Sequence, residues 1–177
     1  CTGWKTVDGK TYYFGTQGPM VTGWQDIQGH TYYFGSDGPM ATQWLTLETG
    51  TYYLGDDGIP RTGKQQMEDG LRLFRPDGTM VTGWEDEEDG RHYYDDQGLM
   101  VSGWTEVEGK RYFLSEEGIM QTGWHEEGEY RYYLQEDGSA AVGRLELEGD
   151  VYYFTPKGIH VILVNKNNPI PKYYKTD

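Results

Sequence analysis

The fold is decided by a stretch that reads Gly23-Trp24-Gln25-Asp26-Ile27-Gln28-Gly29-His30-Thr31-Tyr32-Tyr33-Phe34-Gly35-Ser36-Asp37-Gly38-Pro39-Met40. The same pattern begins twenty residues earlier, at Gly3-Trp4, and recurs with variations toward the C-terminus. A fixed period of about 20–50 residues is the signature of repeat architectures, in which each unit packs on its neighbours. The sequence therefore predicts a repeat protein rather than a compact α/β enzyme.

Three kinds of residue recur every twenty positions, each in its own register. One holds glycines, at Gly18, Gly38, Gly58, Gly78, Gly98, Gly118, Gly138 and Gly158. A second holds tryptophans, at Trp4, Trp24, Trp44, Trp84, Trp104 and Trp124, with Lys64 and Arg144 at the two remaining positions. A third holds methionines, at Met20, Met40, Met80, Met100 and Met120, interrupted by Pro60, Ala140 and His160. These registers define eight repeats over roughly residues 1–160.

Each repeat is typical of a β-hairpin followed by a loop. In the first repeat, Asp8-Gly9 separates two runs of aromatic and β-branched residues, which favour strands. Asp-Gly is a strong signal for a two-residue hairpin turn, because that turn needs positive φ at both central positions. Pairing across it places Trp4 and Tyr13 on one face, and Val7, Tyr12 and Phe14 on the other.

Three repeats carry one more turn residue. They read Glu48-Thr49-Gly50, Glu68-Asp69-Gly70 and Glu88-Asp89-Gly90, and we expect a three-residue turn that ends in a left-handed glycine. Isolated hairpins are marginal in water, so successive hairpins must bury their aromatic faces against one another. No segment sustains a helical period. The predicted fold class is therefore an all-β solenoid of about eight stacked hairpins.

Charge and composition restrict the partners. The chain carries a net charge of −14, and residues 81–140 hold sixteen Asp or Glu against four Lys or Arg. Such a surface disfavours nucleic acid and would attract cations, including quaternary ammonium groups, although a simply solvated face is the preferred interpretation. Cys1 is the only cysteine, which excludes a disulfide framework and suggests a segment cut from a longer protein. No apolar run approaches the ~20 residues that span a membrane.

The repeat resembles the choline-binding or cell-wall-binding repeats of bacterial surface proteins. The shared pattern is Thr-Gly-Trp, a hairpin turn with glycine, Tyr-Tyr-Phe or Tyr-Tyr-Leu, and then Gly-x-Met. The resemblance implies a hairpin solenoid with ligand sites between consecutive hairpins. It also implies an extracellular, wall-associated location and a wall-polymer partner, either choline-bearing teichoic acid or glycan. The sequence leaves a homodimer open.

The sequence departs from the family at one position. Choline-binding repeats usually carry a second tryptophan before the Tyr-Tyr pair, and the resemblance implies a cage of two tryptophans and a tyrosine around the ammonium. Here that position holds Thr11, Thr31, Thr51, Leu71, Arg91, Arg111, Arg131 and Val151. The loss of one wall weakens a cation–π cage, and an arginine there would repel a cationic ligand. In this respect the chain is more similar to the glucan- and glycan-binding relatives.

The candidate ligand-binding residues are aromatic and methionine side chains. They are Trp4, Trp24, Trp44, Trp84, Trp104, Trp124, Tyr13, Tyr33, Tyr53, Tyr93, Tyr112, Tyr133, Met100 and Met120. The best sites are expected where successive repeats both carry tryptophan, and Lys64 and Arg144 should close the sites of their own repeats. The competing interpretation is that the tryptophans are stacking core and that the methionines fill gaps between hairpins.

No motif for catalysis is visible. The histidines are His30, His92, His125 and His160, and none has a partner at a recognised zinc spacing. The serine-hydrolase, phosphate-loop and His-Glu-x-x-His motifs are absent. We therefore expect no enzymatic activity, metal or cofactor in this chain.

The last residues leave the repeat register. Residues 161–174 resemble the opening segment of zinc-dependent D-Ala-D-Ala carboxypeptidases, and two prolines there also fit a stiff linker. We expect residues 161–177 to be a linker or the start of a peptidase domain.

The expected function is a non-catalytic bacterial wall-binding module that recognises choline-bearing teichoic acid, or a related polymer, in aromatic clefts between hairpins. A neutral-glycan-binding module and a structural spacer for a wall peptidase remain open as alternatives.

Overall fold

The computed structural model describes residues 2–161, which form seventeen strands joined by turns and loops, with no helix among them. The strands of the first half are β1 (Gly3–Val7), β2 (Lys10–Phe14), β3 (Gly23–Ile27), β4 (His30–Phe34), β5 (Gln43–Leu47), β6 (Gly50–Leu54), β7 (Gly63–Met67) and β8 (Gly70–Phe74). The others are β9 (Gly83–Glu87), β10 (Gly90–Tyr94), β11 (Gly103–Val107), β12 (Lys110–Leu114), β13 (Gly123–Glu127), β14 (Tyr130–Leu134), β15 (Gly143–Leu147), β16 (Asp150–Phe154) and β17 (His160–Val161).

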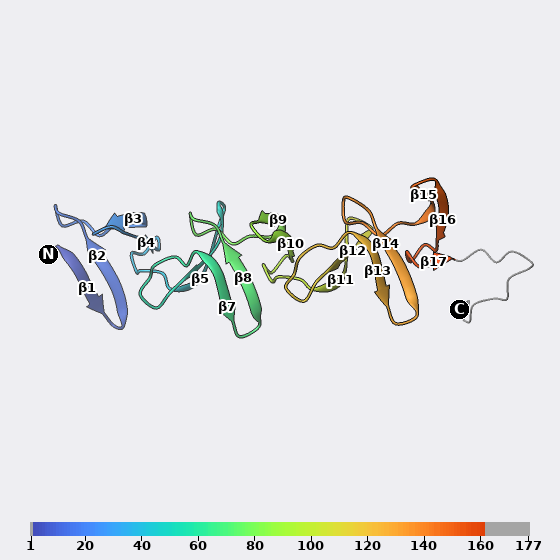
Figure 1. Ribbon diagram of the computed structural model, residues 1–177. Helices are drawn as coiled ribbons and strands as arrows, with labels where there is room; N and C mark the ends of the chain where they lie inside the picture. Colours follow the sequence, from blue (N-terminus) through green and yellow to red (C-terminus); the bar gives the residue numbers. More distant parts are fainter. Residues whose placement is uncertain (1, 162–177) are drawn as a thin grey trace, which may run out of the picture. The chain divides into compact units, whose positions relative to one another are not determined.

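Strands β1 to β16 pair consecutively into antiparallel hairpins, and β17 adds a third strand beside β16 (Figure 1). In the first hairpin Trp4 pairs with Tyr13 and Val7 pairs with Lys10, as the turn residues predict. The same register recurs twenty residues later, where Trp24 pairs with Tyr33. The all-β hairpin-repeat fold class is confirmed.

The expected three-residue turns are wrong. Leu47 pairs directly with Gly50, so the turn contains only Glu48 and Thr49, and the glycine is already the first residue of β6. In the first hairpin, Asp8 and Gly9 both have positive φ, at 50° and 77°. A β-branched residue such as Thr49 disfavours that region. Gly50 instead takes a positive φ of 143° where the chain re-enters the strand.

The periodic methionines contact the periodic glycines at the loops. A Cβ on Gly38 would lie 2.1 Å from Met20 Sδ, and one on Gly138 would lie 2.3 Å from Met120 Sδ. Each methionine therefore packs on the loop glycine of the following repeat, which leaves no room for a side chain there. The methionine position also ties hairpins together through the backbone, because the Met40 N–H donates to the Thr11 carbonyl at 2.7 Å.

Burial follows the second strand of each hairpin. Its third and fifth residues point inward from β6 through β14; the buried apolar ones include Tyr52, Leu54, Phe74, Tyr94, Tyr112, Leu114, Tyr132 and Leu134. The chain divides into two compact units. The first contains the described residues up to Gly83 together with Tyr94–Leu99; the second contains Trp84–Tyr93 and the described residues from Met100 onward.

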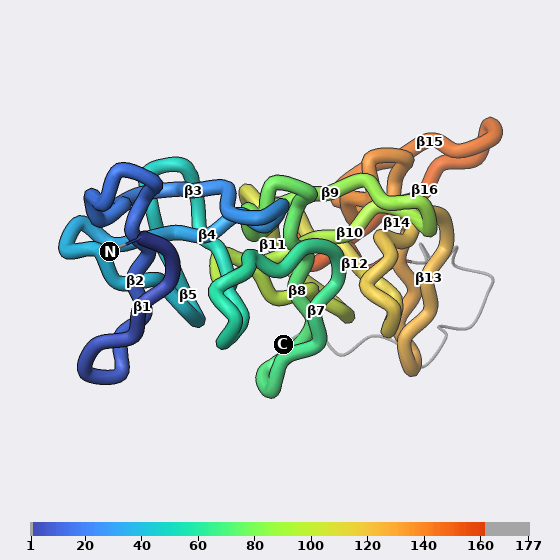
Figure 2. Tube along the Cα trace, turned by 90° about the vertical axis from the view of Figure 1, so that its left-hand side faces the viewer, coloured from blue at the N-terminus to red at the C-terminus, as the bar shows by residue number. Residues whose placement is uncertain are grey.

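The traces in Figure 2 show tight turns standing out at the ends of hairpins such as β1–β2 and β13–β14. No helix in the part of the chain that the structure describes could cross a membrane. The expectation of a linker or peptidase start at residues 161–177 falls almost entirely outside the described residues.

Candidate functional site

The candidate sites lie beside a recurring contact between a tryptophan of one hairpin and a tyrosine of the next. The Trp24 ring on β3 lies 5.1 Å from the Tyr33 ring, its partner within the same hairpin, and 5.0 Å from the Tyr52 ring on β6. Both ring pairs are edge-to-face, which is a preferred arrangement of aromatic quadrupoles. We call the space beside Trp24 and Tyr52 the Trp24 cleft, and we name the other clefts by their tryptophans in the same way.

The geometry repeats wherever the tryptophan is kept and the next hairpin supplies a tyrosine. The inter-hairpin ring pairs are Trp4–Tyr32 at 4.9 Å, Trp84–Tyr112 at 4.8 Å, Trp104–Tyr132 at 4.6 Å and Trp124–Tyr152 at 5.2 Å. Within the described residues, the ring contacts thus join each tryptophan except Trp44 to a tyrosine of the next hairpin rather than to the next tryptophan.

Sequence reasoning missed most of these tyrosines. The candidates Tyr13, Tyr33, Tyr53, Tyr93 and Tyr133 are the intra-hairpin partners of their tryptophans. Of the inter-hairpin partners, only Tyr112 was among the candidates; Tyr32, Tyr52, Tyr132 and Tyr152 were not. The alternation of side chains along the strand could have revealed these tyrosines, since the first residue of each Tyr-Tyr pair faces away from the tryptophan of its own hairpin. Met100 and Met120 pack on Gly118 and Gly138.

The Trp24 cleft contains a cavity of about 450 Å³. Trp24 and Tyr52 line it together with Thr31, Pro60 and Asp77. In the preceding repeat, the Met40 N–H donates to the Thr11 carbonyl. The equivalent bond from residue 60 to the Thr31 carbonyl cannot form, because proline has no N–H. The cavity lies at this junction, where proline also replaces the methionine that fills the neighbouring repeats.

Hydrogen bonds fix three of the residues that line the Trp24 cleft. The Tyr52 hydroxyl lies 3.0 Å from Thr49 Oγ1, in the turn of its own hairpin, and Tyr52 is buried. Thr31 Oγ1 donates to Asp26 Oδ1 at 2.6 Å. Asp77 accepts from the Thr79 hydroxyl and backbone N–H, and these bonds hold the pKa of Asp77 below its usual value. The cleft therefore combines two aromatic walls with an ionised carboxylate.

Three clefts of the second unit contain an arginine. The guanidinium carbons of Arg91, Arg111 and Arg131 lie 5.3, 4.3 and 4.0 Å from the ring centroids of Trp84, Trp104 and Trp124. These distances are within the range of cation–π attraction. The arginines stand where choline-binding repeats usually carry the second tryptophan, so a protein cation now lies on the tryptophan face.

The Trp44 site differs, because Arg72 takes the place of the inter-hairpin tyrosine. Arg72 is 5% exposed, lies 5.2 Å from the Trp44 ring centroid and forms a two-point ion pair with Asp69, at 2.6 and 2.8 Å. That pair raises the pKa of Arg72 and lowers the pKa of Asp69. Trp44 is 46% exposed and borders a groove of about 670 Å³ that Gln43, Gln65 and Gln66 also line.

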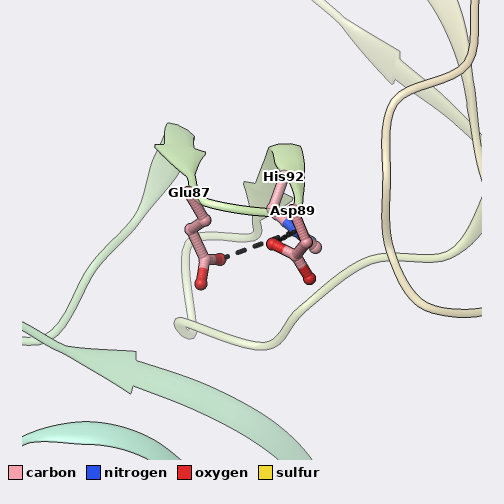
Figure 3. Close-up of side chains that lie close together, drawn as sticks. All are labelled: Glu87, Asp89 and His92. Atoms are coloured by element: carbon pink, nitrogen blue, oxygen red, sulfur yellow. Dashed lines mark hydrogen bonds and ion pairs between the residues drawn. The ribbon is translucent and has the colours of Figure 1, made fainter.

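The hairpin β9–β10 gathers three metal-type donors that sequence spacing did not reveal. One ligand atom each of Glu87, Asp89 and His92 lies within 4.8 Å of the others (Figure 3). His92 is fully buried; its Nε2 lies 3.0 Å from Asp89 Oδ1 and 3.9 Å from Glu87 Oε1. Buried Nδ1 has no hydrogen-bond partner in the described part of the chain. A metal at Nε2 would leave an N–H at Nδ1 without an acceptor, so the geometry favours the hydrogen bond between Nε2 and Asp89 over metal ligation.

Comparisons with solved structures identify relatives of this architecture. CbpJ from Streptococcus pneumoniae TIGR4 is 29% identical, with a TM-score of 0.82 over 91% of this chain and 65% of CbpJ. Choline binding protein F from Streptococcus pneumoniae, crystallised with a peptidoglycan analogue, is 28% identical, with a TM-score of 0.76 over 92% of this chain and 58% of that protein. The choline-binding domain of CbpL from the same organism is 27% identical, with a TM-score of 0.61 over 91% and 87%.

The chain thus spans 65% of the length of CbpJ and 58% of that of choline binding protein F. No curated protein matches the sequence significantly. The model of the choline-binding repeat matches residues 1–25, 21–59 and 101–144, which is more than half of the chain. The hairpin register, the tryptophan–tyrosine clefts and this match agree, and the protein belongs to the choline-binding repeat family.

Proposed function

We propose that the protein is a non-catalytic wall-binding module that takes the quaternary ammonium group of a choline-bearing wall polymer into the Trp24 cleft. The observation that carries this proposal is the cavity of about 450 Å³ that Trp24 and Tyr52 line and that no lysine or arginine of the described residues lines. A desolvated ammonium over a tryptophan face gains up to about 2 kcal/mol from cation–π attraction, and the Asp77 carboxylate adds charge complementarity.

The relatives support the class of ligand. Choline binding protein F carries the ligand in its name and was crystallised with a peptidoglycan analogue, and CbpL has a choline-binding domain. By extension, we place this protein outside the cell and on the wall. The expected carboxypeptidase parent and the homodimer remain predictions that concern parts or copies beyond the described residues.

One cleft gives weak binding. A site worth about 4 kcal/mol binds near millimolar concentration. A polymer that fills two clefts at once gains avidity by a factor on the order of 10². The Trp4 cleft, also in the first unit, offers a second site with neutral Thr11 at the corresponding position. A polymeric ligand is therefore favoured over free choline.

The test is a choline titration followed by intrinsic tryptophan fluorescence and isothermal calorimetry. We expect saturable binding near millimolar choline that Trp24→Ala weakens at least about tenfold, which corresponds to about 1.4 kcal/mol. Trp44→Ala is the matched control, because Trp44 already faces Arg72. Absence of any response to tens of millimolar choline would overturn the proposal.

A second candidate function is neutral-glycan binding at the Trp44 groove. The observation that favours it is an exposed indole bordered by three glutamine side chains, since sugars need a flat aromatic platform and neutral hydrogen-bonding groups. The Tyr53 hydroxyl donates to Gln43 Oε1 at 3.0 Å and so rigidifies this platform. Binding of a wall oligosaccharide that Trp44→Ala abolishes, and that choline does not compete, would support this function.

A further inference from the structure

Two sites four repeats apart form a matched pair within the chain. The Trp24 cleft is lined by Gly29, Thr31, Pro60, Pro76 and Gly78 around a cavity of about 450 Å³. The residues eighty positions later are Gly109, Arg111, Ala140, Pro156 and Gly158, and they line a cavity of only about 80 Å³. Neither junction carries the usual methionine, so the presence of methionine does not explain the difference.

Arg111 and Lys157 line the smaller cavity at the positions that Thr31 and Asp77 hold in the larger one. The guanidinium carbon of Arg111 lies 4.3 Å from the Trp104 ring centroid, and Nη1 donates to the Lys157 carbonyl on the far side of the junction. Trp24 and Tyr52 line the larger cavity, whereas Trp104 and Tyr132 do not line the smaller one. The arginine side chain thus stands between the aromatic walls and the remaining space.

The same arrangement recurs in two other repeats of the second unit. Arg131 lies 4.0 Å from the Trp124 ring centroid, and its Nε lies 3.3 Å from Glu126. Arg91 lies 5.3 Å from the Trp84 ring centroid, and its Nε lies 3.5 Å from Asp86. Each of these carboxylates is on the strand opposite its arginine, so it holds the guanidinium over the ring and partly neutralises it.

These contacts are those that a quaternary ammonium ligand would make. A guanidinium on a tryptophan face is attracted by the same ring quadrupole as choline, and it is covalently tethered. Its local concentration exceeds that of a millimolar ligand, since a short tether alone gives an effective concentration in the millimolar range or above. An anion is a poor alternative ligand here, because residues 81–140 carry a net charge of −12.

We propose that Arg91, Arg111 and Arg131 are built-in cations that occupy the tryptophan clefts of the second unit and confine quaternary ammonium binding to the Trp4 and Trp24 clefts of the first. This inference rests on the proposed function, because the ligand it excludes is the one proposed for the Trp24 cleft. Where the next hairpin supplies a tyrosine, the position of Thr31 and Arg111 is then the specificity-determining one: threonine admits the ligand, and arginine replaces it.

A reciprocal exchange tests the proposal. The protein is labelled with 5-fluorotryptophan, its six indole signals are assigned by single Trp→Phe variants, and choline is titrated while ¹⁹F NMR is recorded. In the parent protein, the Trp4 and Trp24 signals should shift with choline, whereas those of Trp84, Trp104 and Trp124 should not.

Two substitutions should change which tryptophan signals respond to choline. Arg111→Thr removes the tethered cation, so the Trp104 signal should begin to shift with choline. Thr31→Arg places an arginine opposite Asp26, as Arg91 stands opposite Asp86, and should weaken the choline response of Trp24 at least about tenfold. Arg144→Thr is the control, because Arg144 itself stands at the tryptophan position of its hairpin and should alter none of these signals. Circular dichroism checks that each variant is folded.

The outcomes separate the two hypotheses. A Trp104 signal that shifts in the parent protein at the same choline concentration as Trp24 overturns the built-in cation but leaves the proposed function intact. If no signal shifts in the parent protein, the proposed function fails; a Trp104 response in Arg111→Thr would then still support the built-in cation, and its absence would overturn it. Should Arg111→Thr not fold, an unchanged Trp24 response in folded Thr31→Arg would overturn the inference.

Discussion

Among single residues, the position of Thr31 and Arg111 most clearly separates the tryptophans of the two units. Thr31 leaves the Trp24 face accessible from a cavity, while Arg111 covers the equivalent face of Trp104. The flanking residues also change character: the Trp124 cleft uses His160 where most repeats carry methionine, with the two rings 5.4 Å apart. The protonation state of His160 therefore reports on the cation beside it.

His160 should titrate below its ordinary value of 6.5. Burial is the main cause that lowers its pKa, and repulsion from Arg131 adds to it. Because the folded state binds the proton less tightly than the unfolded state, His160 contributes stability above pH 6.5 that is lost as the pH falls toward its folded pKa. Arg131→Gln should raise the pKa of His160, measured from its Cε1–H shift by NMR. An unchanged pKa of His160 would show that the Arg131 charge does not act on the Trp124 cleft.

Asp137 should make stability depend on acid pH. The Ser139 hydroxyl and N–H donate to it at 2.6 and 2.9 Å, and with a further bond from Lys110 they lower its pKa to about 2. The stabilisation is complete above the unfolded value of 3.8 and is lost as the pH falls from there through about 2. Ser139→Ala should raise this pKa.

Urea unfolding at pH 7 and pH 3 provides the measurement. Ser139→Ala should lose more stability at pH 7 than at pH 3, because at pH 3 part of the favourable interaction is already lost in the parent. Exposed Ser102 supplies the control, as Ser102→Ala should have the same small effect at both pH values. An equal loss at both pH values for Ser139→Ala would contradict the assignment.

At the scale of the hairpin, the junctions are held by a recurring backbone bond and a recurring methionine. The N–H groups of Met40, Met80, Met120 and Ala140 each donate at 2.7 Å to the second strand of the preceding hairpin. Pro60 supplies neither the N–H nor the long side chain. The cavity therefore lies where proline replaces the methionine of the repeat, while the hairpins on either side keep their register.

Replacing Pro60 should narrow the Trp24 cleft to the form of the Trp4 cleft, which carries Met40 at this position. In Pro60→Met, the new N–H can donate to the Thr31 carbonyl, and the side chain can pack on Gly78 as Met40 packs on Gly58. We expect slowed hydrogen exchange of the new amide and a choline response of Trp24 that weakens to that of Trp4.

Pro60→Ala is the matched variant, because it restores the donor without filling the space. Its amide should be protected in the same way, while the choline response persists. If both variants retain full choline binding, the side chain at position 60 does not control the cleft.

At the scale of the whole molecule, the sites are unequally distributed between the two units. The first unit contains the Trp4 and Trp24 clefts with threonine at the deciding position, and the second contains the three clefts with arginine. Most of the −14 net charge lies in residues 81–140, where the clefts already hold cations. Charge alone therefore does not mark the place where a cationic ligand is bound.

Binding to a polymer should depend on two clefts together. We expect immobilised choline-bearing polymer to bind about 10²-fold tighter than free choline. Trp4→Ala should remove most of that gain while leaving the choline response of Trp24 unchanged. Surface plasmon resonance on the polymer, beside calorimetry with free choline, measures the two quantities. Equal losses in both assays would show that the clefts do not act together.

The repeat period, the hairpins and their register could be predicted from the amino-acid sequence. These features are local: strand alternation and turn glycines fix which residues oppose each other within ten positions, so Trp4 opposite Tyr13 could be predicted. The sequence also carried the family pattern and the unusual residues at the second-tryptophan position. The length of the Glu48-Thr49 turn was predicted wrongly. The extra glycine suggested a three-residue turn, whereas Gly50 pairs with Leu47 as the first residue of the strand, and the β-branched Thr49 disfavours the positive φ of the other turns.

Only the tertiary structure decided which side chains from different hairpins meet. The contact of Trp24 with Tyr52 rather than with Trp44 depends on how one hairpin stacks on the next, and the residues of a single repeat do not specify that offset. The trio of Glu87, Asp89 and His92 is different, because it lies within one hairpin and a tight turn brings it together. Whether a cleft is open or filled depends on the side-chain volume of three successive repeats, and therefore on packing rather than on pattern.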